Sequence, residues 1–153
     1  MAGLQSRPLF EMTAYLTPFE DIGLTPLGRR QITHVTHGQF EGERLRGEIT
    51  PGGGEWALSR FDRVGRLDVR LLLRTDDDAP IYMSYTGLMH GSREMMRRAF
   101  THGDVDPEQY YFRTTPYFET GDGRYAWLNR LVAVGVGRTL PNAGVSYAVH
   151  EIL

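Results

Sequence analysis

Glycine and proline divide this chain into short runs of residues that favour β-strands. The 153 residues contain 18 glycines and eight prolines, most of them between such runs, where they are typical of tight turns. The clearest run covers residues 66–75, in which every second residue is apolar: Leu67, Val69, Leu71 and Leu73. Because alternate residues of a strand face opposite sides, this pattern predicts a strand with one buried face.

Further runs predict eight to ten antiparallel strands in total, with one short helix. The other predicted strands cover residues 9–17, 29–40, 44–50, 56–61, 80–89, 110–119, 127–136 and 145–152. Residues 92–100 predict the helix, because Ser92 is a favourable N-cap and an apolar stripe follows it. Residues 18–27 are expected to form a loop with Ile22 and Leu24 buried. Antiparallel strands in this number close into a barrel or fold as two sheets, and we expect one barrel domain over residues 1–153, with a sandwich as the alternative.

The run at residues 110–129, YYFRTTPYFETGDGRYAWLN, reads as strand, turn and strand. Its odd positions carry Arg113, Glu119 and phenols, while its even positions are mostly apolar. Asp122 and Gly123 form the dipeptide that favours a short hairpin. The polar and aromatic face predicts the lining of a ligand cavity, although such a face is equally typical of the solvated side of a sheet.

These strands supply candidates for chemistry on a small organic molecule. Arg113 and Arg70 could hold an anionic oxygen, and Glu119, Asp68 or Glu41 could act as general base if burial raises its pKa. The predicted substrate-binding residues provide aromatic stacking surfaces and one amide that could polarise a carbonyl; they are Trp56, Tyr82, Tyr111, Trp127, Asn129 and Tyr147. Alternatively, Asp68, Arg70, Arg113 and Glu119 form a buried ion network that fixes strand register.

Several other classes of protein are disfavoured. The chain has no cysteine, which excludes disulfides and thiolate chemistry, and its formal charge of -2 without a basic stripe argues against a nucleic-acid partner. No apolar run is long enough for a membrane helix, so we expect a soluble, cytoplasmic protein. The acidic turn at residues 76–78 lacks calcium-loop spacing, and His34 and His37 point to opposite faces of a strand unless a bulge intervenes at Gly38. We therefore expect no metal and no cofactor.

Four segments carry a resemblance to a known family. GQFEGERLRGEITPGGGEW, LDVRLLLRTDDDAPIY, YYFRTTPYFETGDGRYAWLN and VAVGVGR resemble family 3237 of the domains of unknown function, which occurs in bacteria and fungi. The resemblance covers about residues 28–151. It implies a small calycin-like, or lipocalin-like, β-barrel and brings no settled activity. His37-Gly38 and Glu55 depart from the family pattern, in which Gly-Gly and an aspartate are usual.

Three functions remain open at this point. The first is a cofactor-free lyase or isomerase that acts on an aromatic or polyketide-like molecule by general acid–base chemistry, and the second is a lipocalin-like carrier. An enzyme needs a general base with a perturbed pKa in its pocket, whereas a carrier can have a purely apolar one. The third is an interaction module, favoured if the cavity falls below roughly 300 Å³. A homodimer is expected, with the predicted strand at residues 9–17 as a candidate edge for pairing.

Overall fold

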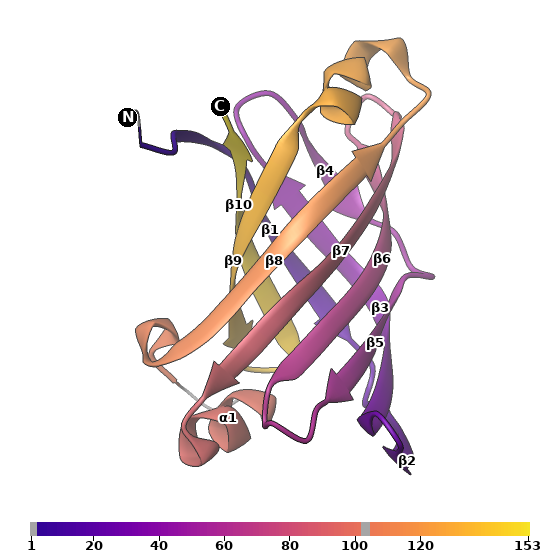
Figure 1. Cartoon of the computed structure of the whole chain (residues 1–153). Helices are drawn as coiled ribbons and strands as arrows, with labels where there is room; N and C mark the ends of the chain where they lie inside the picture. Colours follow the sequence, from indigo (N-terminus) through magenta and orange to yellow (C-terminus); the bar gives the residue numbers. More distant parts are fainter. Residues whose placement is uncertain (1–2, 102–104) are drawn as a thin grey trace.

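The computed structural model describes residues 3–101 and 105–153, whose strands form an antiparallel β-barrel (Figure 1). The strands are β1 (Ser6–Leu16), β2 (Glu20–Thr25), β3 (Gly28–Glu41), β4 (Arg46–Ile49), β5 (Gly54–Ser59), β6 (Gly65–Thr75), β7 (Pro80–Gly91), β8 (Tyr110–Glu119), β9 (Val132–Leu140) and β10 (Gly144–Ile152). The helices are α1 (Arg93–Phe100) and two 3₁₀ segments, η1 (Pro107–Gln109) and η2 (Gly123–Arg130). The predicted all-β barrel is therefore confirmed.

The barrel closes because β1 pairs with β10 on one side and with the second part of β3 on the other. β4 and β5 are short and share one position between β3 and β6, so the closed ring has eight positions. β2 pairs with the first part of β3 and extends the sheet beyond the ring. Closure excludes the alternative of an open sandwich. It also leaves residues 11–16 of β1 paired on both sides, so this strand does not offer the free edge expected for dimer formation.

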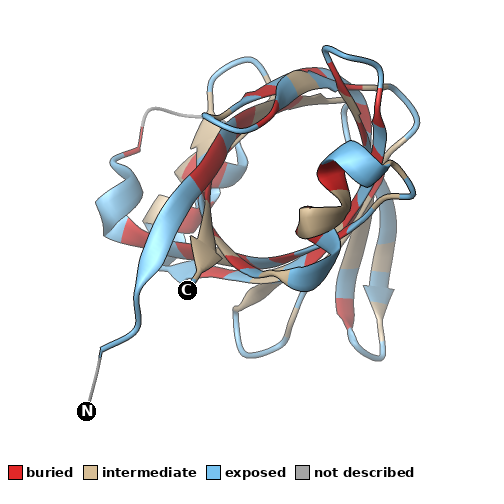
Figure 2. Cartoon of the chain, turned by 90° about the horizontal axis from the view of Figure 1, so that it is seen from above, coloured by how far each residue is buried: buried red, intermediate tan, exposed pale blue. Residues whose placement is uncertain are grey.

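Side chains of one parity fill the barrel, as the alternation of buried and exposed segments along the strands shows (Figure 2). Leu67, Val69, Leu71 and Leu73 of β6 point inward as predicted, and Leu73 and Ile81 are completely buried. On β8, however, the even positions such as Phe112 and Phe118 are buried, while the odd positions face outward. The prediction that the odd face of residues 110–119 lines the cavity is therefore wrong. Phenylalanine rings lose more by exposure than arginine and glutamate do, so they determine which face is buried.

The two ends of the barrel differ. η2 lies at the upper end in Figure 1 and inserts Tyr125 and Leu128 into the core. A hairpin was expected in this place, but the Asp122 side chain accepts a hydrogen bond from the backbone N–H of Arg124 and begins a helical segment instead. Residues 123–130 therefore do not form the start of the predicted strand.

The lower end carries α1 and β2 (Figure 1). The Ser92 hydroxyl accepts a hydrogen bond from the backbone N–H of Met95, which confirms the predicted N-cap of α1. The region predicted as a loop with two buried residues contains β2, on which Ile22 and Leu24 are 56% and 70% exposed. None of the helices in the described ranges is long and apolar enough to span a membrane.

Candidate functional site

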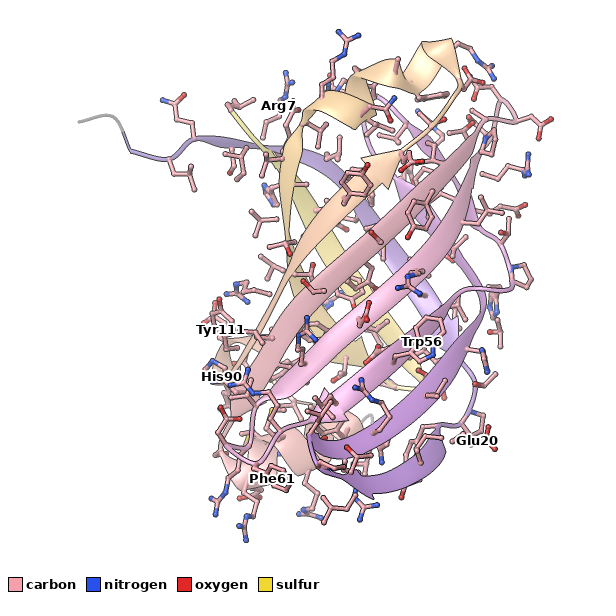
Figure 3. All side chains as sticks on the ribbon, turned by 45° about the vertical axis from the view of Figure 1, so that its right-hand side comes forward. Arg7, Glu20, Trp56, Phe61, His90 and Tyr111 are labelled. Carbon is pink, nitrogen blue, oxygen red and sulfur yellow. The ribbon has the colours of Figure 1, made fainter. Side chains whose placement is uncertain are left out.

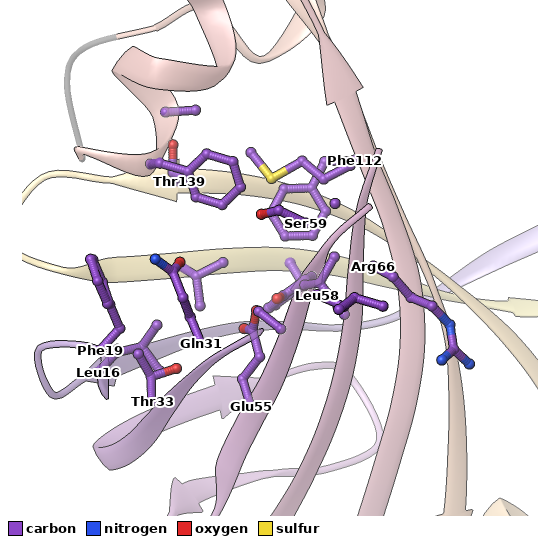
Figure 4. A pocket seen from close by; sticks show the side chains of 18 residues that line it. Leu16, Phe19, Gln31, Thr33, Glu55, Leu58, Ser59, Arg66, Phe112 and Thr139 are labelled. Atoms are coloured by element: carbon purple, nitrogen blue, oxygen red, sulfur yellow. The ribbon is translucent and has the colours of Figure 1, made fainter. Parts of the chain in front are cut away.

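A cavity occupies the lower half of the barrel, beside α1 (Figure 4). Its lining is mostly apolar, and Phe19 and Phe100 at its margin are each about half exposed. The polar residues of its lining come from five strands: Gln31, Thr33, Glu55, Ser59, Arg66, Thr139 and Tyr147. Its volume of about 110 Å³ is below the roughly 300 Å³ of a common ligand pocket, so it can enclose one small ring or a short chain rather than a large ligand.

Glu55 is the acidic residue of this lining (Figure 4). β5 places it on the inner face of the barrel, opposite Thr33 of β3 and Val69 of β6. Burial raises the pKa of its carboxyl group to about 7, because the charged form loses its hydration. Among the residues that the structure describes, it forms no ion pair. At neutral pH the side chain therefore exists as comparable amounts of acid and carboxylate.

Aromatic side chains form the inner wall beside this carboxyl. Tyr147 of β10 packs edge-on against Tyr85 and Phe112, with ring centroids 5.2 and 5.4 Å apart. Burial raises the pKa of both tyrosines, and the charge of Glu55 raises both further. Both phenols are therefore protonated at neutral pH and available as hydrogen-bond donors.

Two buried hydroxyl groups on this wall have no hydrogen bond of good geometry among residues 3–101 and 105–153. They belong to Thr139 and Tyr147, which both line the cavity, and the Tyr147 hydroxyl interacts with the neighbouring Tyr85 hydroxyl. Leaving a buried hydroxyl unpaired costs about 1–3 kcal/mol. Gly137 of β9 lies opposite Tyr147 and leaves space for the adjacent Phe112 ring, since a Cβ there would come within 2.7 Å of that ring. Polar groups of this kind are often satisfied by a ligand or by water.

The structure places the five predicted catalytic residues on the outer surface of the barrel. Asp68 and Arg70 project from β6, Arg113 and Glu119 from β8, and Glu41 from β3. Four of them lie on the outer face of β6 and β8, and none forms an ion pair with any described residue. The alternative of a buried ion network is therefore wrong. None of the five lines the cavity, and a catalytic role for them stays a prediction.

Most of the predicted substrate-binding residues also lie outside the cavity. Tyr147 alone lines the cavity, while Trp56, Tyr82 and Tyr111 lie on the outer surface, as Figure 3 shows for Trp56 and Tyr111. The Arg70 guanidinium lies 5.5 Å from the centre of the Trp56 ring, and that of Arg113 lies 5.1 Å from the Tyr111 ring.

The last two predicted binding residues belong to the upper end and have structural contacts there. Trp127 in η2 packs against the core below the Arg44 guanidinium, which lies 4.1 Å from its ring. The Asn129 side chain accepts a hydrogen bond from the backbone N–H of Thr120 and donates one to its carbonyl oxygen. This amide closes the loop before η2 and is thereby occupied.

Among the described residues, the histidines form no metal site. Gly38 pairs in register, and the irregularity in β3 lies at Thr36 instead; His37 stacks on Tyr15 with 4.7 Å between ring centroids. Within the described ranges no group of three or more histidine, aspartate or glutamate side chains is placed to hold a metal ion.

Comparison with known proteins adds the family and the fold. Residues 4–152 match the family model described as "Protein of unknown function (DUF3237)". UPF0311 protein RPA1785 from Rhodopseudomonas palustris is 32% identical over 150 residues, which are 98% of this chain and 97% of the relative. UPF0311 protein CA_C3321 from Clostridium acetobutylicum is 34% identical over 115 residues, covering 75% of this chain and 73% of the relative.

Solved structures have the same fold. The crystal structure of RPA1785 superimposes with a TM-score of 0.95 at 30% identity and covers all of both chains. A β-barrel-like protein from Acinetobacter baumannii AYE gives a TM-score of 0.86 at 36% identity, over 100% of this chain and 98% of that one. A protein from Penicillium herquei, described as an enzyme, gives 0.72 at 19% identity, over 100% and 97% of the two chains, and shares the fold alone. The chain thus belongs to the DUF3237 family of β-barrel proteins.

Proposed function

We propose that the protein binds a small organic molecule in the lower cavity and transfers protons on it without a cofactor, with Glu55 as the general base. The observation that carries this proposal is the Glu55 carboxyl, which faces the cavity without a cationic partner and has a pKa of about 7. A base with a pKa near the working pH combines a useful ionised fraction with an adequate affinity for the proton. A purely apolar carrier has no use for a carboxyl group that costs free energy to ionise.

The neighbouring phenol supplies the second half of the chemistry. When the Glu55 carboxylate removes a proton from a carbon next to a carbonyl group, the C–H electron pair moves into the new C=C bond and negative charge develops on the carbonyl oxygen. The Tyr147 hydroxyl lines the cavity and has no hydrogen bond of good geometry among the described residues, so it can donate one to that oxygen and stabilise the enolate. Return of the proton to a different carbon gives an isomerase, and loss of a leaving group from the enolate gives a lyase.

The size and lining of the cavity indicate the substrate. About 110 Å³ accommodates the reacting part of an aromatic or polyketide-like ketone, while the remainder lies against Phe19 and Phe100 at the margin. The small volume taken alone favours an interaction module. A barrel filled only by its own side chains, however, gives no reason for a buried carboxyl and a phenol without a hydrogen bond of good geometry in contact with the same space.

The test is hydrogen exchange in D₂O. Cyclic 1,3-diketones and hydroxyaryl ketones are incubated with the protein, and loss of the acidic C–H signal is followed by NMR against buffer. We expect exchange to be accelerated by the parent and reduced at least ~100-fold in Glu55→Gln, the usual size of a general-base contribution. Glu119→Gln is the matched control, because it removes a carboxyl group from the outer surface. Loss of exchange in Glu119→Gln but not in Glu55→Gln would place the base on the outer face instead.

The mostly apolar lining favours a second candidate, a lipocalin-like carrier. A carrier binds these ketones and stabilises the protein against heat without any exchange above buffer, and Glu55→Gln then binds at least as well as the parent. Thermal shifts measured on the same panel therefore separate the two candidates.

A further inference from the structure

The outer face of β6, β7, β8 and β9 carries an unusual number of exposed apolar and aromatic side chains. Seven of them are between 38% and 69% exposed: Leu72, Tyr82, Leu88, Tyr111, Tyr117, Val132 and Val136. Taking roughly 200 Å² for a full side chain of this size, they expose on the order of 600 Å². Most monomers have no larger apolar patch, and this area approaches the roughly 800 Å² that each partner contributes to a stable interface.

We propose that this face, hereafter the β6–β9 face, is the contact surface of a homodimer, in which it packs against the same face of a second copy. The charges and the relief of this face are distributed so that two copies of it fit together. Strand register arranges the outward side chains in rows that cross β6, β7 and β8. From one end of the face to the other these rows are Arg66–Leu88–Arg113, Asp68–Thr86–Thr115, Arg70–Ser84–Tyr117 and Leu72–Tyr82–Glu119.

A twofold axis in the contact plane, perpendicular to the strands and between the second and third rows, brings four of the five charged side chains of these rows opposite an opposite charge. The fifth, Arg66, meets Leu72 of the second copy. Each strand then packs antiparallel against the same strand of the second copy. The first row of one copy therefore meets the fourth row of the other, and the second row meets the third. Asp68 then faces Arg70 of the second copy, and Arg113 faces Glu119 of the second copy. Each pair occurs twice, as an isologous contact requires. Two-sheet packings tolerate the rotation of about 30° that sheet twist adds.

The four charged residues have no ion-pair partner within their own chain. Among the described residues, Arg113 donates a hydrogen bond only to the adjacent carbonyl oxygen of Phe112, and Glu119 accepts one from the Tyr117 hydroxyl. Their charges are therefore available for pairing across an interface, where complementary charges set the orientation of the partners.

The relief of the face is complementary under the same axis. A surface depression of about 450 Å³ lies over the first two rows, and its lining includes Thr86, Gly87, Leu88, Thr115, Arg66, Tyr111 and Arg113. The side chains that the axis brings above it are Tyr82 and Tyr117 of the second copy, which project from the other two rows. Tyr117 of the second copy then lies opposite the small Thr115, and Tyr82 of the second copy lies against Leu88, so the two aromatic side chains enter the depression.

Sedimentation equilibrium with charge-reversal variants tests this arrangement. We expect the parent to be a dimer at micromolar concentration. Arg113→Glu and Glu119→Arg each place like charges opposite one another twice, so the dissociation constant of each variant alone should rise at least ~100-fold. An equimolar mixture of the two variants restores both attractive pairs, and we expect it to form a heterodimer. Arg46→Glu, on the outer face of β4, is the matched control and should dimerise like the parent.

Three results would overturn the proposal. The first is a parent that remains monomeric at ~100 μM. The second is a dimer that tolerates both single reversals, because it then uses another surface. The third is a mixture that stays monomeric while both variants retain the circular dichroism spectrum and melting behaviour of the parent, because the two residues then do not face each other.

Discussion

Replacing Glu55 by glutamine should make stability less dependent on pH. The pKa of Glu55 is about 7 in the folded protein, against 4.5 for an ordinary glutamate, so the folded state retains a proton that the unfolded chain releases between these two values. Stability falls with increasing pH wherever the folded state binds more protons than the unfolded chain. The stability lost through Glu55 therefore reaches its full value above pH 7. The 2.5-unit difference corresponds to about 3 kcal/mol, of which about 2.5 kcal/mol falls between pH 5 and pH 8.

The measurement is urea unfolding of the parent and of Glu55→Gln at pH 5 and pH 8. The free energy of unfolding of the variant, relative to the parent, should rise by about 2.5 kcal/mol between the two pH values. For a domain of this length this corresponds to a relative melting-temperature shift of roughly 5–10 °C. Other ionisable groups are common to both proteins and cancel in the comparison, and Glu48→Gln on the exposed side of β4 serves as the control. If the free energies of unfolding of the parent and of Glu55→Gln change by the same amount between pH 5 and pH 8, the assignment of a buried, uncompensated carboxyl is refuted.

Three further variants test other parts of the structure by the same unfolding measurement. Tyr147→Phe removes a buried hydroxyl without a hydrogen bond of good geometry among the described residues and should raise the free energy of unfolding by about 1 kcal/mol; a loss of similar size would show that the hydroxyl is hydrogen-bonded in solution. Glu151→Gln should cost about 1 kcal/mol at neutral pH, because Arg7, at 2.8 Å, and Arg44 hold the pKa of Glu151 below its ordinary value. That cost should vanish as the pH falls through the lowered pKa, whereas a cost unchanged at pH 3 would contradict the ion pairs. Gly137→Ala places a methyl group against the Phe112 ring and should cost about 1–3 kcal/mol, whereas Gly121→Ala, with open space around it, should be neutral.

The sequence could predict the barrel because the residues that determine it are local. Leu67, Val69, Leu71 and Leu73 occupy every second position of residues 66–75, and the alternate positions are polar except for Leu72, so one face of this strand is the one to be buried. The N-cap of α1 is also predictable from the sequence, since Ser92 precedes the apolar stripe of the helix. Both features depend on neighbours within four residues.

The site was not predictable in the same way, because it depends on which face of a strand closes inward. In β5 the apolar Trp56 and Leu58 have one parity, and Glu55 and Ala57 have the other. Hydrophobicity alone does not identify the face that lines the cavity, because Leu58 and Glu55 both line it while the Arg70 guanidinium lies over the Trp56 ring. In β8 the buried phenylalanines were a usable signal, but the arginine and phenols of the other face were interpreted as a lining. The departure at Glu55 from the family's aspartate was the available hint of this residue.

The way in which β1 closes the barrel has a consequence for how the chain reaches its native state. β1 pairs with β10, and the Arg7–Glu151 contact joins residues 144 positions apart. During synthesis β1 therefore emerges long before this partner, and until then the growing chain has unpaired strand edges. Contacts of such sequence separation slow folding, because a large loop must close before they form. We expect ring closure to be the late step of folding, and a chaperone that shields strand edges to raise the folded yield more than one that accelerates local structure.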